Sequence, residues 1–326
     1  MERFDVVALG ELLIDFTENG ISGQGNSIYE ANPGGAPCNV LGMLAKAGRK
    51  TAFIGKVGQD IFGNRLKATL KEVGIDTSGL IMDETVRTTL AFVETLADGD
   101  RNFSFYRNPG ADMMLKEEDL LVNLLENTKI FHFGTLSMTH EDVRQATKRA
   151  IQIAKESGAV ISFDPNLRTP LWKTLDEARE QAAYGFSKCD ILKISDNEIQ
   201  WFTGEEDYDA GIRKLRSQYE IPLILLSMGK SGSRAYYKDL RIEAAPFLQE
   251  NTIETTGAGD TFGGCCLHHV LKYGLNNMDE ERLYRMLTFA NGAASIITTR
   301  KGALRMMPEL HEVEKLIADR MPMFQS

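Results

Sequence analysis

The sequence predicts an α/β fold of three layers, in which helices cover both faces of a mostly parallel sheet. Apolar runs typical of buried strands alternate with helical segments along most of the chain. The 326 residues are 43% hydrophobic and contain no Pro- or Ser-rich linker, so we expect one domain, residues 1–326, with a sizeable core. Ligands of such sheets bind beyond the carboxyl ends of the strands. Polar motifs that follow strands are therefore the candidate site.

The alternation is clearest in two stretches. An apolar run at 51–57 precedes a helical segment at 60–73, and 129–133, 140–156 and 159–163 repeat strand, helix and strand. Two regions interrupt it, 12–29 and 88–107. In the second region, strand-like 89–93 and 102–106 flank Asp98-Gly99-Asp100, and Asp-Gly between two strands predicts a hairpin.

Composition opposes several classes of function. A formal net charge of −9 disfavours general binding to nucleic acids or anionic membranes. No apolar run reaches the roughly 18 residues of a membrane span, and the N-terminus enters a strand without a signal core, so we expect a cytoplasmic protein. The four cysteines form no C-x-x-C pair, and the five histidines show no metal-ligand spacing.

Residues 254–264 read E-T-T-G-A-G-D-T-F-G-G, which places small residues and one acid where an irregular segment should become a helix. The amides of Gly257, Ala258 and Gly259 can approach an anion there, and a helix N-terminus adds about half a positive charge. Asp260 would accept a proton from an attacking hydroxyl. This pattern indicates phosphoryl transfer, although a capping Asp explains the acid structurally.

A paired glycine, Gly34-Gly35, begins a second run of small and aliphatic residues that ends at Gly48. Paired glycines let the backbone close on a polyhydroxyl ligand, and Asn39 offers both a donor and an acceptor to sugar hydroxyls. Close packing of a helix on the sheet explains the same residues equally well.

In this order and some 220 residues apart, the two runs resemble the signatures of the PfkB, or ribokinase-like, family of carbohydrate kinases. The resemblance implies a ribokinase-like α/β/α domain, a small β lid made of about 12–32 and 88–110, Asp260 as catalytic base, and ATP with Mg²⁺. By analogy, two lids would pair into a homodimer.

Two other phosphate-binding motifs are incomplete in this chain, because each lacks a required glycine. Gly229-Lys230-Ser231 has the tail of a Walker A loop, but Ile224 stands where that loop requires glycine. Around Gly257 and Gly259, Phe262 replaces the third glycine of the dinucleotide pattern. Neither a P-loop enzyme nor a dehydrogenase is therefore favoured.

Three segments are candidates for binding the sugar. Asp15 follows a buried strand, Phe105 and Arg107 end the hairpin, and Arg168 follows a strand that breaks at Pro165. An acid in a surface turn and a solvated Arg107 in a packed lid are the structural alternatives.

The segments F-Y-R-N-P-G-A-D at 105–112 and F-D-P-N-L-R-T-P-L-W at 163–172 resemble the fructokinases of the family. The resemblance implies fructose as substrate, with Arg107 and Arg168 facing the sugar. Two arginines also suit a carboxylate, so 2-keto-3-deoxygluconate kinase is the leading alternative.

On the nucleotide side, Lys193 begins a segment that resembles the family motif N-x-x-E, with Ser195 in place of Asn. The resemblance assigns Mg²⁺, held through water, to Glu198, while a capping box from Ser195 to Glu198 explains the same residues. It also implies nucleotide contacts from four further positions: Ser227, Gly229, Gly232 and Asn291.

Relatives in the family also bind a monovalent cation near the anion-binding loop. The matching oxygens here come from Glu254, Thr256 and the 298–303 loop. Glu254 replaces the usual Asp, which leaves activation by K⁺ open.

The expected mechanism is direct in-line transfer from Mg-ATP to a fructose hydroxyl, taken as O6. Asp260 removes the proton, and the helix N-terminus is expected to keep its carboxylate ionised. A sugar sensor without catalysis is the alternative of another class, but the intact Asp260 and anion-binding residues argue against it.

Overall fold

The computed structural model describes residues 3–95 and 101–321. Nine strands form the main sheet: β1 Phe4–Leu9, β4 Thr51–Gly58, β5 Ile75–Asp83, β8 Thr128–Gly134, β9 Val160–Asp164, β10 Ile191–Ser195, β11 Leu223–Ser227, β12 Ser233–Tyr237 and β13 Leu240–Ala244. Their order is β13-β12-β11-β10-β9-β8-β1-β4-β5. Pairing is parallel from β11 to β5 and antiparallel at β12 and β13. The predicted, mostly parallel sheet is confirmed.

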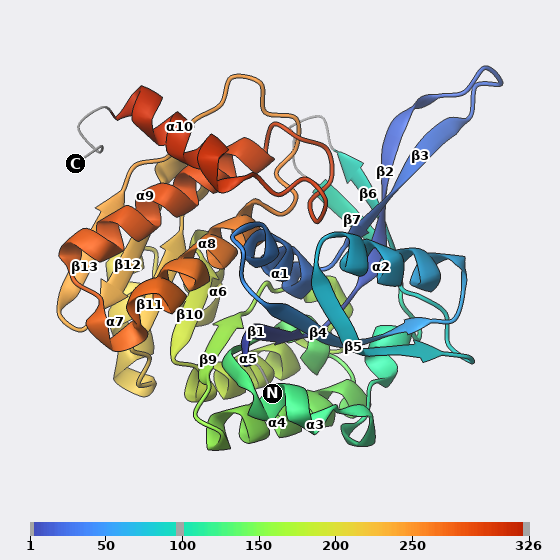
Figure 1. Ribbon diagram of the computed structural model, residues 1–326, viewed down its shortest axis with the longest axis horizontal. Helices are drawn as coiled ribbons and strands as arrows, with labels where there is room; N and C mark the ends of the chain where they lie inside the picture. The colour runs from blue at the N-terminus through green and yellow to red at the C-terminus, as the bar shows by residue number, and fades with distance from the viewer. Residues whose placement is uncertain (1–2, 96–100, 322–326) are drawn as a thin grey trace.

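Helices cover both faces of this sheet (Figure 1). One layer contains α1 Ala36–Lys46, α2 Ile61–Glu72, α8 Ala258–Tyr273, α9 Glu280–Ile297 and α10 Leu310–Arg320. The other contains α3 Val122–Glu126, α4 Glu141–Glu156, α5 Leu175–Lys188, α6 Asp196–Thr203 and α7 Tyr208–Gln218. Successive residues of β1 face opposite layers: Val6 and Ala8 pack in one core, and Val7 and Leu9 in the other.

The elements expected from the alternation are confirmed. The run at 51–57 is β4, and 60–73 contains α2, whose N-cap Asp60 accepts hydrogen bonds from the amides of Phe62 and Gly63. The later stretch forms β8, α4 and β9. Short 3-10 helices connect several elements: η1 Ala111–Met114, η2 Glu117–Asp119, η3 Thr135–Met138, η4 Thr169–Leu171, η5 Gly229–Ser231 and η6 Leu275–Asn277.

A second, smaller sheet lies beside the main sheet and its helices (Figure 1). It consists of β2 Leu13–Ile21, β3 Ser27–Gly34, β6 Leu90–Thr95 and β7 Arg101–Tyr106, in the order β3-β2-β6-β7. The long β2-β3 ribbon projects away from the helical layers (Figure 1). Strands β6 and β7 pair antiparallel, which confirms the expected pairing of the two runs. The predicted turn at Asp98-Gly99-Asp100 lies outside the described residues.

Across 3–95 and 101–321, no helix combines the length and the apolar character that crossing a membrane requires.

Candidate active site

A cleft of about 420 Å³ lies where the carboxyl ends of the central strands meet the small sheet. Strands β1, β8 and β9 each end just before a residue that lines it, and the first turns of α1 and α8 form part of its wall. The lining residues are Glu11, Leu13, Asp15, Gly35, Ala36, Asn39, Phe105, Leu136, Asn166, Arg168, Lys193, Thr255, Thr256, Gly257, Gly259 and Asp260. Most predicted site residues are therefore brought together, and the predicted Gly34 and Ala258 are chain neighbours of lining residues.

The two glycine-rich runs meet at one hydrogen bond. The Asn39 side chain donates through Nδ2 to Oδ2 of Asp260 over 2.8 Å, although the two residues are 221 positions apart in sequence. Both side chains are buried. The Oδ1 atom of Asn39 is also buried and has no hydrogen-bond partner among the described residues. A buried acceptor of this kind is costly unless it binds a ligand donor, as a sugar hydroxyl would provide.

Burial raises the pKa of Asp260 above its ordinary value, against the opposing effects of the Asn39 hydrogen bond and of the Lys193 and Arg168 charges. The sequence argument considered only the helix N-terminus, which favours the charged carboxylate. The structure corrects this reasoning, because the effect of burial is larger. A raised pKa makes the carboxylate a stronger base, as proton abstraction requires.

The first turn of α8 contains the residues that the sequence predicts to bind an anion. Its N-cap Gly257 has a left-handed φ of 75°, and a Cβ atom there would lie 2.6 Å from the Cβ of Ala303, so glycine is required. The amide of Ala258 donates to the carbonyl of Thr255 over 3.2 Å. That amide would have to exchange partners before it could bind a phosphoryl oxygen.

Lys193 supplies a positive charge beside this loop. A Cβ atom on Gly259 would lie 3.1 Å from Lys193 Nζ, and Nζ forms an ion pair of 3.0 Å with Oδ2 of Asp164. Burial alone lowers the pKa of Lys193, but the carboxylates of Asp164, Glu198 and Asp260 together raise it above its ordinary value. Lys193 is therefore a buried cation at the loop.

The other wall of the cleft depends on the paired glycines. Gly35 has a φ of 128°, and a Cβ atom there would lie 2.4 Å from the carbonyl oxygen of Glu11. A Cβ atom on Gly34 would lie 2.5 Å from Oδ2 of Asp15. The two glycines therefore admit the Glu11 backbone and the Asp15 carboxylate close to the start of α1.

Glu11 is a functional candidate that the sequence reasoning missed. It is 5% exposed, and its Oε1 accepts a hydrogen bond of 2.7 Å from the amide of Ala36. Burial raises its pKa to about 7. Asp164, with a pKa also raised to about 7 by burial, was missed in the same way. The available signal was an acid at or just after the carboxyl end of a buried strand.

Arg107 was expected to face the sugar, and the structure does not place it in the cleft. Its guanidinium is buried, with an ion pair of 2.7 Å from Nη2 to Oδ2 of Asp112. Nη1 donates to Oγ1 of Thr139 over 2.8 Å and Nη2 to the carbonyl of Leu136 over 3.1 Å. The side chain therefore links the end of β7 to the η3 segment by hydrogen bonds. It contacts the backbone of Leu136, which itself lines the cleft.

Glu198 does not line the cleft but braces a segment that does. Its Oε2 accepts from the amide and Oγ of Ser195, and this capping box of α6 was expected. Its Oε1 accepts from the amide of Leu167 over 2.7 Å. The carboxylate thus fixes the loop that presents Asn166 and Arg168 to the cleft.

The other residues predicted to contact the nucleotide are not among those that line the cleft. Asn291 donates from Nδ2 to the carbonyls of Ala244 and Ala245, over 3.1 and 3.0 Å. Gly232 has a φ of 89° and lies so close to the Ala244 carbonyl that a Cβ atom would be 2.3 Å from it. Both residues pack the end of β13. Ser227 and Gly229 lie at the carboxyl end of β11 and in η5.

The two segments expected to share a monovalent cation lie side by side. Oε1 of Glu254 accepts from the amide of Gly302 over 2.8 Å, and the amides of Ile253 and Glu254 both donate to the Thr298 carbonyl. Thr256 lines the cleft. Within the described ranges, no cluster of three or more His, Cys, Asp or Glu side chains is suited to hold a metal ion.

The chain is similar to known proteins both in sequence and in structure. The model of the pfkB family of carbohydrate kinases matches residues 3–310. The chain is 41% identical over 305 residues to probable fructokinase-2 of Arabidopsis thaliana, which covers 93% of the chain and 92% of that relative. The structure of a fructokinase from Xylella fastidiosa with bound ATP matches with a TM-score of 0.88 and 30% identity, over 97% of this chain and 98% of that one. A fructokinase from Vibrio cholerae O395, with fructose, ADP and calcium bound, matches with a TM-score of 0.87 and 28% identity, over 96% and 99% of the two chains.

Proposed function

The chain belongs to the pfkB family of carbohydrate kinases, and we propose that it transfers the γ-phosphoryl group of ATP to a hydroxyl of fructose, O6. The observation that carries this proposal is the buried Asn39–Asp260 pair in the cleft, with Oδ1 of Asn39 left for a ligand donor. The fructokinases among its relatives support fructose as the sugar.

In the proposed mechanism, Asp15 and Asn39 orient the sugar hydroxyls, and Asp260 accepts the proton of the attacking hydroxyl as the new P–O bond forms. The phosphoryl oxygens carry negative charge during transfer. Lys193 and the amides of the α8 first turn stabilise that charge. No covalent phosphoenzyme is needed, because Asp260 lies in the same cleft as the sugar-binding residues.

The residues present fit a magnesium ion held mainly by substrate phosphates and water. Bound Mg²⁺ would neutralise charge on the ATP phosphates. Both oxygens of Glu198 already accept hydrogen bonds from Leu167 and Ser195, so we assign this carboxylate a role through water. For a monovalent cation, Glu254 and Thr256 remain the candidate residues, with K⁺ as the candidate ion.

The charges of the cleft favour a neutral sugar over a sugar acid. Arg107 forms an ion pair with Asp112 and does not line the cleft. The cations among the lining residues are Arg168 and Lys193. Glu11, Asp15 and Asp260 line the same cleft. Burial raises the pKa of Glu11 to about 7, and each of these acids repels a carboxylate substrate to the extent that it is ionised. This supports fructose over 2-keto-3-deoxygluconate.

We also propose that residues 1–326 form one kinase domain and that the small sheet acts as a lid. Leu13, Asp15 and Phe105 come from this sheet and line the cleft, where a cover would exclude water. Strands β2, β3 and β7 of this sheet expose four large side chains, Ile21, Ile28, Tyr29 and Tyr106, by 44–66%. Such a surface suits a second lid, so the proposal includes a homodimer, to be tested by light scattering of the native protein and of an Ile21→Lys variant.

The proposal includes no nucleic-acid or membrane partner, and it places the protein in the cytoplasm. The net charge of −9 supports the first part. The four cysteines are free and buried, as is usual in a reducing compartment.

The test is ATP-dependent ADP release with Mg²⁺ over fructose, glucose, ribose, adenosine and 2-keto-3-deoxygluconate, with and without K⁺. A clear preference for fructose supports the proposal. A preference for the keto-acid would show that Arg168 binds a carboxylate. No turnover with any compound would favour a sugar sensor without catalysis.

A further inference from the structure

The sheet face that packs against α1 and α8 becomes polar at the carboxyl ends of β8, β9 and β10. Ile130 of β8 packs in the core of this layer, and His132 follows it two positions later on the same face. Ile191 and Lys193 repeat this pattern on β10, and Asp164 ends β9 between them. All three polar side chains are buried. Buried charges cost free energy, and even a buried pair adds little net stability, so this cluster points to a function.

Asp164 and Lys193 form an ion pair across two adjacent strands. Strands β9 and β10 run parallel, and the residues before the pair, Phe163 and Leu192, lie opposite each other. Oδ2 of Asp164 is 3.0 Å from Nζ of Lys193. The other oxygen, Oδ1, accepts a hydrogen bond of 3.2 Å from the amide of Asn166, which lines the cleft. One carboxylate therefore contacts both the lysine and the loop on the sugar side of the cleft.

The Lys193 ammonium lies against the first turn of α8. A Cβ atom on Gly259 would be 3.1 Å from Nζ, and the lysine also lines the cleft. A lysine side chain is a flexible stem with a compact charge, so its position depends on its partners. Three carboxylates act on that charge, in decreasing order of effect: Asp164, Glu198 and Asp260.

The charge of Lys193 depends most on Asp164. Burial lowers the pKa of Lys193, and the carboxylate of Asp164 is the largest of the opposing effects. Two other titratable neighbours are neutral near pH 7, because burial lowers the pKa of His132 to about 3 and raises the pKa of the Cys266 thiol. Burial raises the pKa of Asp164 itself to about 7, so this carboxyl is ionised at higher pH. In that range it favours the protonated lysine.

We propose that Asp164 is a positioning residue for phosphoryl transfer, which holds the Lys193 ammonium against the first turn of α8. The inference rests on the proposed function, in which Lys193 stabilises the charge on the transferred group. The lysine and the Asn166 amide contact the two oxygens of one carboxylate, so Asp164 also links the phosphoryl side of the cleft to the sugar side.

The test variant is Asp164→Asn, in which the amide oxygen can still accept from Asn166 but the negative charge is lost. The matched control is Asp190→Asn, which removes another carboxylate between the same two strands. Oδ2 of Asp190 accepts from the amide of Ile161 over 2.7 Å, at the amino ends of β9 and β10, away from the cleft. Both variants therefore keep an acceptor for a backbone amide, and they differ in whether a lysine loses its partner.

We expect Asp164→Asn to lower kcat about 10- to 100-fold, because a misplaced charge stabilises the transferred group less well. The alkaline limb of the pH profile of kcat should move to lower pH by about 1 unit or more, while the KM for fructose changes little. Asp190→Asn should show neither effect. In a Lys193→Met protein, Asp164→Asn should lower kcat no further, because Asp164 acts through the lysine. This neutral double variant leaves no unpaired charge, so it keeps the test valid if Asp164→Asn alone does not fold.

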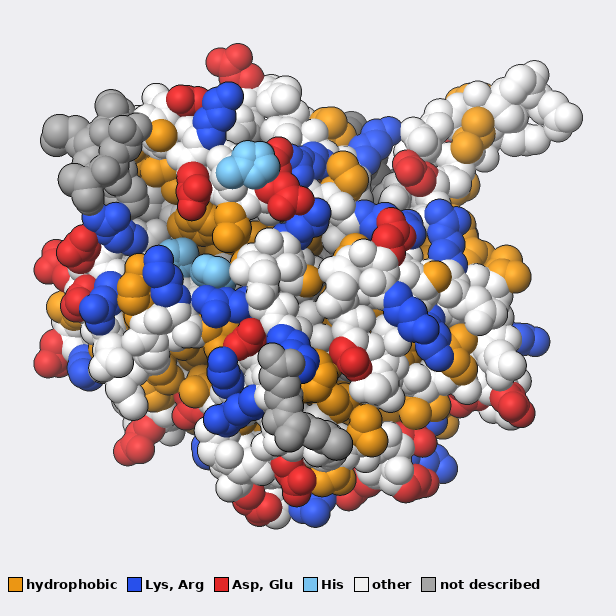
Figure 2. Space-filling model, in the orientation of Figure 1, with side chains coloured by type: hydrophobic (Ala, Val, Ile, Leu, Met, Phe, Trp, Pro, Cys, Tyr) orange, Lys and Arg blue, Asp and Glu red, His pale blue; other side chains and the backbone are white. Residues whose placement is uncertain are grey.

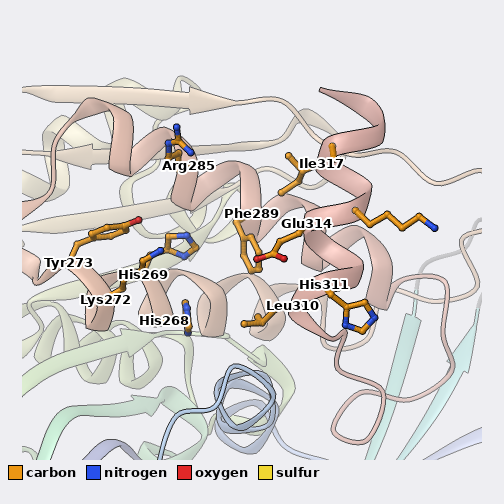
Figure 3. A pocket seen from close by; sticks show the side chains of 12 residues that line it. His268, His269, Lys272, Tyr273, Arg285, Phe289, Leu310, His311, Glu314 and Ile317 are labelled. Atoms are coloured by element: carbon orange, nitrogen blue, oxygen red, sulfur yellow. The ribbon is translucent and has the colours of Figure 1, made fainter. Parts of the chain in front are cut away.

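NMR of the lysine side-chain signals in the full-length protein measures the charge of Lys193 without turnover, and Lys193→Met assigns its signal. Lys272 is the internal control, because it lies in the last turn of α8, in a cavity of about 640 Å³ between α8, α9 and α10. Figure 2 shows this hollow with histidine side chains around it, and Figure 3 shows Lys272 at the end where the α8 histidines lie. We expect Asp164→Asn to lower the pH at which Lys193 loses its proton and to leave Lys272 unchanged.

The proposal is overturned if Lys193 titrates alike in the native protein and in Asp164→Asn, or if kcat of Asp164→Asn follows that of Asp190→Asn at every pH. It is also overturned if raised Mg²⁺ restores the turnover of Asp164→Asn, because Asp164 then acts on the metal ion. A native protein that turns over none of the sugars would contradict the proposed function, whereas the lysine titration would still decide whether Asp164 controls the charge of Lys193.

Discussion

Replacing Arg107 by Met tests whether this residue supports the fold or contacts the sugar. Methionine keeps much of the aliphatic length but removes the ion pair to Asp112 and the hydrogen bonds to Thr139 and Leu136. The Asp112 carboxylate, itself 3% exposed, would lose its cation. Breaking one partner of a buried pair costs about 3–5 kcal/mol. For a chain of this length, that corresponds to a fall in Tm of about 4–7 °C.

The assay is thermal unfolding without sugar, with Arg305→Met as the matched control. Arg305 forms an ion pair of 2.7 Å with Glu72, but both side chains are more than one third exposed, so its loss should cost about 1 kcal/mol or less. The reasoning is refuted if Arg107→Met unfolds like Arg305→Met and instead raises the KM for fructose about 10-fold. That result would restore Arg107 as a direct sugar contact.

Three further changes have defined outcomes. Gly35→Ala should lower stability and turnover, because its Cβ would lie 2.4 Å from the Glu11 carbonyl at a φ of 128°; unchanged unfolding and kinetics would contradict this. Burial raises the pKa of Glu11 from 4.5 to about 7, so the folded state binds the proton of this carboxyl more tightly than the unfolded state does. The free energy of unfolding should therefore fall by up to about 3 kcal/mol as the pH rises from about 4.5 to 7. Urea titrations at both ends of this range should show a smaller fall for Glu11→Gln, and an equal fall would refute the assignment. Glu198→Ala should raise the KM for fructose several-fold, because it removes the acceptor of the Leu167 amide. Glu198→Gln keeps an acceptor and should raise the KM less. Equal KM values for the two variants would show that Glu198 does not hold the loop in place.

Local patterns predicted the architecture and the centre of the site. Strand and helix periods located β4, α2, β8, α4 and β9 to within a residue or two, because buried and exposed faces alternate within each element. The small residues before Asp260 predicted the turn at the start of α8, because a left-handed N-cap such as Gly257 favours glycine.

Features that depend on distant partners were not predictable in this way. Arg107 finds Thr139 32 positions later in the chain, so sequence alone did not distinguish a sugar contact from a structural anchor. Burial of Asp260 by elements far apart in sequence reversed the expected direction of its pKa shift. The burial of Glu11 was equally unpredictable, because no residue near it in sequence indicates that the start of α1 will cover its carboxylate.

The most direct test of the account is the turnover of Asp260→Asn with fructose and Mg-ATP, measured together with fructose affinity. The amide keeps the size of the side chain but cannot serve as the base. We predict a fall in kcat of about 10²–10⁴-fold, the usual contribution of a general base, with fructose affinity changed only modestly. Near-normal turnover in a folded variant would contradict the assignment of Asp260 as the base.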